Sequence, residues 1–386
     1  MELTPRFFRA PERSFFLLGP RGTGKTTWLR QAMPGALWLN LLHPEEYRAL
    51  SARPERLREM VLGSPPTQQD VVIDEVQRVP EVLNVVHDLI ESGPPKRYVL
   101  TGSSARKLRQ GGVDLLGGRA VLRTLHPFMA AERPDFSLEA ALQHGLVPLV
   151  VASDAPDDVL GAYAGLYLEQ EVKAEGMVRN LDQFARFLEA VSFSHAQVLN
   201  VSAVARETGA NRKTVEGFLE VLEDLLLAFR LQVFTRRAKR RTAAHPKLYL
   251  FDAGVFRSLR PAGPLDRPEE IGGAALEGLV AQHLRAWVAY GNAELELFTW
   301  RTRSDAEVDF VVYGPDGFWA VEVQNARVVR PADLRSLHTF LADYPEAKGV
   351  LLYRGERRLL KGGIVCVPVE DFLRELRPGE EPAAGV

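Results

Sequence analysis

The sequence has few of the features that would place it outside the ordinary globular proteins. Of its 386 residues only Cys366 is a cysteine, which excludes an internal disulfide and a cysteine-based metal cage and favours a small buried apolar residue there. No apolar run reaches eighteen residues, and residues 1–6 lack the apolar segment of a signal peptide. These absences predict a cytoplasmic protein that has no membrane partner.

An excess of charge of one sign is also absent, since the formal net charge at pH 7 is -2. Such a balance gives no global attraction to nucleic acid, so any binding of this kind has to come from local basic patches. The hydrophobic fraction of 46% and the charged fraction of 25% are typical of a globular protein, and the length allows two or three domains.

The strongest motif follows an apolar run at residues 15–18 and has the form G-x-x-x-x-G-K-T. Its glycines let backbone N–H groups surround phosphate oxygens, its lysine reaches the β- and γ-phosphates, and its threonine hydroxyl can ligate Mg²⁺. A helical pattern continues to Ala32 and stops at Pro34. We therefore predict a phosphate loop that binds ATP with Mg²⁺, the alternative being a chance glycine turn. The predicted binding residues are Gly19, Pro20, Arg21, Gly22, Thr23, Gly24, Lys25, Thr26 and Thr27.

A second apolar run, residues 71–73, is followed by two carboxylates, Asp74 and Glu75. A strand that ends in acidic residues is common, but beside a phosphate loop the pair is what ATP hydrolysis requires. Asp74 would hold Mg²⁺, and Glu75 would orient or deprotonate the attacking water. Lys25, Asp74 and Glu75 are therefore the predicted catalytic residues.

Two further segments predict contacts with the nucleotide. The buried strand at residues 98–100 ends in small polar residues, of which Thr101 and Ser103 are candidates for sensing the γ-phosphate. A simple strand-end turn is the alternative. Arg119 follows a glycine pair and can act as an arginine finger in trans or in cis, or it can be a solvated surface residue.

Together these motifs carry a resemblance. The segments GPRGTGKT, VVIDEVQRVP, LTGSS and LLGGR resemble prokaryotic AAA+ ATPases that have an N-terminal P-loop domain (AAA_14-like) and a C-terminal region of uncharacterised function. The resemblance implies an ATPase core at residues 1–125, with Arg119 in the family's GR position. A helical connector is expected at 126–185, where Arg179 is either a second nucleotide contact or a helix-end arginine.

Two helical patterns joined at Gly209 predict a winged helix-turn-helix within residues 186–262. The second helix begins with polar and basic residues, and five positive charges within residues 236–241 take the place of a wing. A module for packing or oligomerisation, with a solvated hairpin tip, is the alternative. The predicted nucleic-acid residues are Asn211, Arg212, Lys213, Thr214, Arg236, Arg237, Lys239, Arg240 and Arg241.

Residues 263–378 have another signature, a helix with Glu277, a strand with Asp309 and a partner strand with Glu322 and Gln324. This pattern resembles the PD-(D/E)XK nuclease fold, which implies a second Mg²⁺ site on the three acidic residues with Gln324 beside them. The resemblance places a lysine where Gln324 stands, so cleavage is in doubt and a degenerate, structural copy of the fold is favoured. Residues 379–386 are expected to be a disordered tail.

The whole sequence predicts an α/β protein with a P-loop AAA+ parallel sheet, a helical and winged-helix domain, and an α/β restriction-endonuclease-like domain. We expect an ATPase whose nucleotide state is coupled to binding of nucleic acid, above all DNA. Assembly into a homo-oligomer and binding of a protein partner are compatible with this interpretation. Two alternatives stay open, an ATP-dependent regulatory switch that binds protein, and an ATP-gated, Mg²⁺-dependent nuclease.

Overall fold

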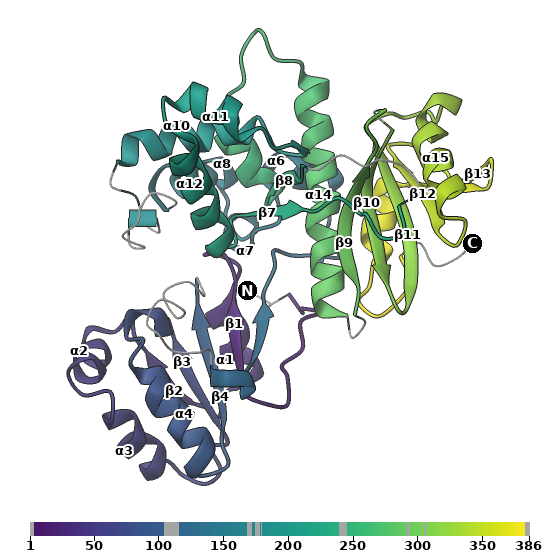
Figure 1. Cartoon of the computed structure of the whole chain (residues 1–386). Coiled ribbons are helices and arrows are strands. Elements are labelled where there is room, and N and C mark those ends of the chain that lie inside the picture. Colours follow the sequence, from purple (N-terminus) through teal and green to yellow (C-terminus); the bar gives the residue numbers. More distant parts are fainter. Residues whose placement is uncertain are drawn as a thin grey trace. The chain divides into compact units, whose positions relative to one another are not determined.

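The computed structural model describes residues 4–382 apart from 104–115, 168–171, 174–177, 179, 239–244, 292–293 and 305. The chain has the predicted α/β architecture (Figure 1). No helix in this described part is both long and apolar enough to cross a lipid bilayer.

The chain divides into two compact units. The N-terminal unit comprises Phe8–His126 and Leu222–Leu227. The C-terminal unit comprises Met1–Phe7, Pro127–Val221 and Ala228–Val386. Each unit has its own sheets and its own apolar core, and we describe them separately.

A five-stranded parallel sheet in the order β2-β3-β4-β1-β5 is the frame of the N-terminal unit. Its strand β4 lies between β1 and β3, and the parallel sheet agrees with the P-loop fold predicted from the sequence. Parallel strands in this arrangement end at one edge, so the loops after β1, β3 and β4 meet there. The strands are β1 (Phe15–Leu18), β2 (Leu37–Asn40), β3 (Asp70–Asp74), β4 (Arg97–Gly102) and β5 (Val121–Thr124).

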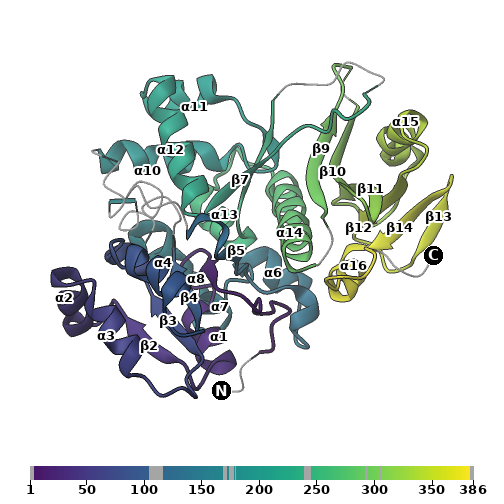
Figure 2. The same ribbon diagram turned by 60° about the horizontal axis from the view of Figure 1, so that its bottom comes forward.

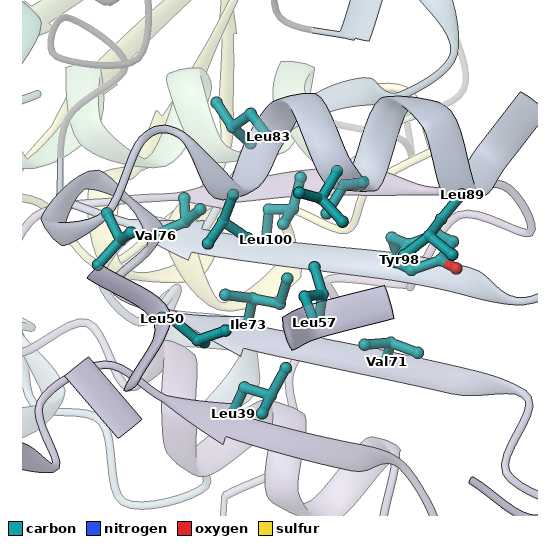
Figure 3. Packing of buried hydrophobic residues seen from close by; sticks show 14 of the residues in the cluster. Leu39, Leu50, Leu57, Val71, Ile73, Val76, Leu83, Leu89, Tyr98 and Leu100 are labelled. Carbon is teal, nitrogen blue, oxygen red and sulfur yellow. The ribbon is translucent and has the colours of Figure 1, made fainter. Parts of the chain in front are cut away.

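The core of this unit explains why its strands read as continuous apolar runs. Leu50, Leu57 and Leu89 from three helices pack with one face of the sheet in a single cluster (Figure 3). Phe15 and Val72 alternate with strand residues of that cluster and are equally buried, so both faces are covered. The helices are α1 (Lys25–Ala32), α2 (Pro44–Ala52), α3 (Arg56–Gly63) and α4 (Val82–Ser92), with the 3-10 turns η1 (Val76–Arg78) and η2 (Leu116–Gly118).

The first half of the C-terminal unit is mainly helical. Its helices α11 and α12 are joined at Gly209, whose left-handed backbone (φ 64°) ends α11. A small antiparallel sheet in the order β6-β8-β7 accompanies them, an order of elements compatible with the predicted winged helix. The elements are η3 (Ala130–Glu132), α6 (Leu138–His144), α7 (Pro148–Val151), α8 (Pro156–Ala162), the π-helix η4 (Tyr163–Tyr167), α10 (Leu181–Ser192), β6 (Gln197–Val198), α11 (Val201–Thr208), α12 (Arg212–Asp224), β7 (Ala228–Leu231), β8 (Lys247–Leu250) and α13 (Ala253–Leu259).

The second half contains a mixed six-stranded sheet in the order β13-β14-β12-β11-β10-β9. Strands β10 and β11 are antiparallel partners and form a hairpin with its turn at residues 314–317. Helices α14 and α15 lie on opposite sides of this sheet (Figure 1, Figure 2). The elements are α14 (Pro268–Tyr290), β9 (Glu296–Arg301), β10 (Glu307–Gly314), β11 (Gly317–Gln324), η5 (Pro331–Leu334), α15 (Arg335–Asp343), β12 (Lys348–Tyr353), β13 (Leu359–Lys361), β14 (Ile364–Pro368) and α16 (Val369–Glu375).

His283 links α14 to the segment before α6. Its Nδ1 lies 2.7 Å from the carbonyl oxygen of Leu279, and its Nε2 accepts a hydrogen bond of 2.9 Å from the Ala130 N–H. Because Nε2 accepts, the ring is neutral and carries its proton on Nδ1. Burial lowers the pKa of His283 to about 4.

We expect His283 to make the stability of the protein depend on pH. Its pKa is lower in the folded state than in the unfolded chain, so the unfolded chain takes up the proton first as the pH falls. The stabilisation is complete above about pH 6.5 and is lost towards about pH 4. Urea midpoints of the parent and of His283→Gln at about pH 7 and about pH 5 test this. The parent should lose more stability than the variant, and equal losses would contradict the assignment.

Candidate functional site

The phosphate loop connects β1 to α1, and its glycines are required by its path. Gly22 and Gly24 have φ angles of 83° and 85°, which are strained for residues with a side chain. A Cβ atom on Gly19 would lie 2.5 Å from the backbone oxygen of Leu125. Gly24 is the N-cap residue of α1, so the first N–H groups of that helix can hold an anion.

Lys25 and Thr26, two of the predicted binding residues, begin α1 directly after the loop. The Lys25 side chain is buried, and its Nζ donates to the carbonyl oxygens of Gly19 at 2.7 Å and Pro20 at 3.2 Å. The ammonium therefore lies inside the curve of the loop. The Thr26 hydroxyl donates to Asp74 Oδ2 at 2.8 Å, so the two predicted Mg²⁺ ligands at the ATP site are adjacent.

Thr101 connects the two predicted acidic residues. Its hydroxyl donates to Asp74 Oδ1 and accepts from the backbone N–H of Glu75 at 3.1 Å. Glu75 has a left-handed backbone, with φ 61° and ψ 46°, directly after β3. Thr101, near the end of β4, is thus hydrogen-bonded to both acidic residues. A displacement of either residue would alter its hydrogen bond to Thr101.

Gln77 belongs to this site although no motif pointed to it. Its Nε2 donates to Glu75 Oε2 at 2.5 Å and lies 3.4 Å from Ser103 Oγ. A Cβ atom on Gly102 would come within 2.6 Å of Gln77 Oε1, so the glycine that ends β4 leaves room for this side chain. The left-handed backbone of Glu75 turns the chain back, which returns the side chain of Gln77, two residues later, to the strand ends.

Arg119 lies at the other edge of the sheet. It precedes β5, whose first residue pairs with Phe15 at the start of β1, whereas the phosphate loop follows the end of β1. Its Nε donates to Glu91 Oε1 at 2.5 Å, near the end of α4. The structure does not bring Arg119 to the phosphate loop of its own chain, and a role in trans stays a prediction. Arg179 lies outside the described residues.

The beginning of α12 contains four of the residues predicted to contact nucleic acid. Asn211 Oδ1 accepts from the Thr214 N–H at 2.8 Å and from the Thr214 hydroxyl at 3.1 Å. This is the bonding of a helix N-cap, so Asn211 and Thr214 already have a structural task. Arg212 and Lys213 are exposed on the first turn.

The predicted wing is described only in part. Arg236 pairs with Glu296 and lies over the Tyr313 ring, with 4.8 Å from guanidinium carbon to ring centroid. Its side chain is therefore held against the edge of the larger sheet. Arg237 is exposed and has a left-handed backbone with φ 51°. Lys239, Arg240 and Arg241 lie outside the described residues.

The acidic residues of the C-terminal sheet surround a lysine that the sequence motifs did not indicate. Lys247 opens β8, and its Nζ lies 2.9 Å from Glu277 Oε1, 2.9 Å from Asp309 Oδ1 and 2.5 Å from Glu307 Oε1. Its side chain is 5% exposed. We call these four residues the Lys247 cluster. Tyr249 adds a hydrogen bond of 2.6 Å from its hydroxyl to Glu277 Oε1.

Glu322 and Gln324 lie beside this cluster on β11. Gln324 Nε2 donates to Glu322 Oε1 at 3.3 Å, and the Val323 N–H donates to Asp309 Oδ2 at 2.9 Å. Glu322 Oε2 is buried and has no hydrogen-bond partner among the described residues. Burial, followed by repulsion from Asp309, raises the pKa of Glu322 well above its usual value, so its neutral form is favoured.

Positive groups of the protein itself face the carboxylates of the cluster. Burial raises the pKa of Glu277 to about 7, an effect that Asp309 strengthens and Lys247 opposes. Burial by itself would lower the pKa of Lys247, but the attraction of the surrounding acidic groups prevails and raises it well above its usual value. Lys247 therefore remains an ammonium. Arg301 adds a second positive charge, 3.6 Å from Glu307.

The residues predicted for a second Mg²⁺ site do not fit a metal ion in this geometry. Glu277 Oε1 and Asp309 Oδ1, which would face a cation, already accept from the Lys247 ammonium. The described residues contain no group of three or more His, Cys, Asp or Glu side chains that could hold a metal ion. A signal for the lysine was present in the sequence, since Lys247 opens an otherwise apolar strand and a buried charge requires a partner.

Comparisons with known families divide the chain into three parts. Residues 11–133 match a family described as an AAA domain. Residues 135–266 and 272–372 match two domains of unknown function, DUF8612 and DUF4143. Together with the sheet order and the phosphate loop, the first match supports an AAA-like, ATP-binding ATPase. None of the curated proteins matches the chain.

Two solved structures are distantly similar. One is a Type III CRISPR defence DNA nuclease activated by cyclic oligoadenylate, 14% identical, with a TM-score of 0.19. The alignment covers 92% of this chain and 48% of that one, so the chain spans about half its length. The other is protein VC1899 from Vibrio cholerae, 10% identical, with a TM-score of 0.21 and coverage of 94% and 96%. Scores this low carry no argument about fold or function.

Gly19→Ala should weaken nucleotide binding. The added methyl group would meet the Leu125 backbone at 2.5 Å, so the loop would have to move away from β5. We expect affinity for a fluorescent ATP analogue to fall by about tenfold or more, since each tenfold loss is about 1.4 kcal/mol. Gly35→Ala is the matched control, because Gly35 is exposed and has no atom within 4 Å of an added Cβ. Equal binding by both variants would contradict the assigned loop.

Proposed function

We propose that this chain is an ATPase that hydrolyses ATP with Mg²⁺ and couples its nucleotide state to DNA binding. The observation that carries the proposal is the hydrogen bond of 2.8 Å between Thr26 and Asp74. It joins the end of the phosphate loop to the end of β3, where a cation bound to both residues would face the phosphates. The family match of residues 11–133 supports the ATPase part.

The residues of the loop fit a nucleotide. The N–H groups at the start of α1 would hold the phosphates, and the Lys25 ammonium would exchange the carbonyl oxygens of Gly19 and Pro20 for phosphate oxygens. Mg²⁺, when bound, neutralises the charge on the β- and γ-phosphates. Thr26 and Asp74 would hold it from the protein side.

Glu75 would take the proton of the attacking water. A general base has to be held in position, and Gln77 binds the Glu75 carboxylate while Thr101 binds its backbone N–H. Because Thr101 also bonds Asp74, β4 would keep the base and the metal ligand in a fixed relation. Ser103 completes this group through Gln77.

Arg119 enters the proposal only through a second copy of the chain. Its place at the opposite edge of the sheet separates it from the phosphate loop that follows β1 in the same chain. In a homo-oligomer it would supply positive charge to the nucleotide of a neighbouring copy. A lone chain would then hydrolyse ATP slowly.

The coupling to DNA is supported by the first turn of α12. Arg212 and Lys213 are exposed there, on the second helix of the predicted helix-turn-helix. Asn211 and Thr214 are engaged in the capping bonds. Arg212 and Lys213 are therefore the two residues of this turn that we assign to DNA contact. A protein-directed switch is the rival function, and it predicts no effect of DNA on hydrolysis.

The first prediction concerns hydrolysis. The parent should hydrolyse ATP faster with single-stranded, duplex or branched DNA, and Glu75→Gln should lower kcat by about 100-fold or more because it removes the base but keeps the side-chain shape. Glu59→Gln is the matched control, since Glu59 is an exposed acidic residue on α3. Basal activity that ignores every DNA would favour the protein-directed switch. Normal hydrolysis by Glu75→Gln would exclude the catalytic assignment.

The role of Arg119 in trans has its own test. Recovery of activity on mixing Lys25→Ala with Arg119→Ala would support it.

The second prediction concerns DNA affinity. Replacing Arg212 and Lys213 together by alanine should weaken DNA binding and reduce the slope of log affinity against log salt concentration by about 2, because two phosphate contacts are lost. Fluorescence anisotropy with labelled duplex DNA over a range of salt concentrations measures both quantities. Arg48 and Arg56, exposed on α2 and α3, form the control pair. An unchanged slope would sink the proposal that α12 contacts DNA.

A further inference from the structure

The Lys247 cluster gathers charged side chains from three separate elements. Lys247 comes from β8, Glu277 from α14, and Glu307 and Asp309 from β10. The two β10 residues are two positions apart, so their side chains point to the same face of the strand. This places all three carboxylates around one buried nitrogen.

The hydrogen-bonding capacity of the ammonium matches its surroundings. Lysine has three N–H donors, and Nζ donates hydrogen bonds of 2.9 Å to Glu277 Oε1 and Asp309 Oδ1. Glu307 Oε1 forms a third ion pair with Nζ at 2.5 Å. The other Asp309 oxygen is engaged by the Val323 N–H, and Glu277 Oε1 is shared with the Tyr249 hydroxyl.

A divalent cation would have to compete with this ammonium. A cation held between Glu277 and Asp309 would lie close to the ammonium, because one oxygen of each carboxylate is only 2.9 Å from Nζ. Two cations cannot share that position, since their repulsion in a poorly solvated site is large. Lys247 cannot easily leave, as its side chain is 5% exposed and its strand is paired on both sides by β6 and β7.

We infer that the Lys247 ammonium takes the position in which Glu277 and Asp309 would otherwise hold a divalent cation, so that the C-terminal sheet contains an internal ion-pair network and not a metal-dependent cleavage site. The network ties β8 to α14 and β10 without any bound ion. This inference is independent of the proposed ATPase activity. If that activity and its DNA coupling are right, the C-terminal unit binds DNA without cutting it.

The test measures Mn²⁺ binding to the nucleotide-free full chain by electron paramagnetic resonance. The parent and Asp309→Asn should bind Mn²⁺ equally, because any binding that they share lies elsewhere, for example at the ATP site. Lys247→Met removes the ammonium and leaves its carboxylates unpaired, so it should bind Mn²⁺ at least about tenfold more tightly than the parent. Adding Asp309→Asn to Lys247→Met should remove that gain.

Thermal unfolding gives a second readout. Lys247→Met should have a Tm lower by about 10 °C, since a buried ion pair has lost one partner, and Mn²⁺ should restore part of the loss. Lys348→Met is the control, because Lys348 pairs with Glu381 in an exposed ion pair and its loss should create no Mn²⁺ site. A folded Lys247→Met variant that gains no Mn²⁺ binding would overturn the inference.

The parent protein keeps the inference testable even if Lys247→Met does not fold. A Mn²⁺ site in the parent that Asp309→Asn or Glu277→Gln abolishes would show that a metal displaces the ammonium, and would overturn the inference. Plasmid DNA incubated with the parent and Mg²⁺ should stay uncut, and nicking that disappears in Asp309→Asn would do the same. None of these readouts depends on ATP hydrolysis, so failure here is distinguishable from failure of the proposed function.

Discussion

The carboxylate of Asp74 is the point on which the N-terminal site depends. It is 1% exposed, and its two oxygens accept from hydroxyls on two different elements, Thr26 at the start of α1 and Thr101 in β4. A buried carboxylate is costly unless it is hydrogen-bonded, so its position is stable only when β3, β4 and the phosphate loop meet at one sheet edge. The order of the strands therefore fixes which groups bind the Asp74 carboxylate.

Local sequence was informative where function depends on residues close together in the chain. The phosphate loop, the strand that ends at Asp74 and the strand that contains Thr101 were all predicted, because apolar runs of strand length and glycine at left-handed positions are local signals. Gln77 was missed because its position depends on the left-handed backbone of Glu75. A glutamate in the sequence does not predict that conformation.

Long-range contacts account for the rest of what was missed. Lys247 meets Glu277 and Asp309 across 30 and 62 residues, and nothing near Lys247 in the sequence indicates that these side chains converge. The motif indicated Gln324 as the position of the expected lysine, and glutamine cannot supply a positive charge. In the structure a lysine from another strand contacts the same acidic residues. An interpretation based on one position of a motif misses a charge that arrives from elsewhere in the fold.

The two acidic sites of this chain differ in the charge of their hydrogen-bond donors. Asp74 accepts from neutral hydroxyls, which satisfy its oxygens but leave its negative charge available to attract a cation. Asp309 and Glu277 accept from an ammonium, which binds one oxygen of each and brings a positive charge with it. A cation that arrives at the first site gains attraction, whereas at the second it meets a positive charge already in place. The same kind of residue is thereby suited to bind Mg²⁺ with a nucleotide in one unit and to hold the fold together in the other.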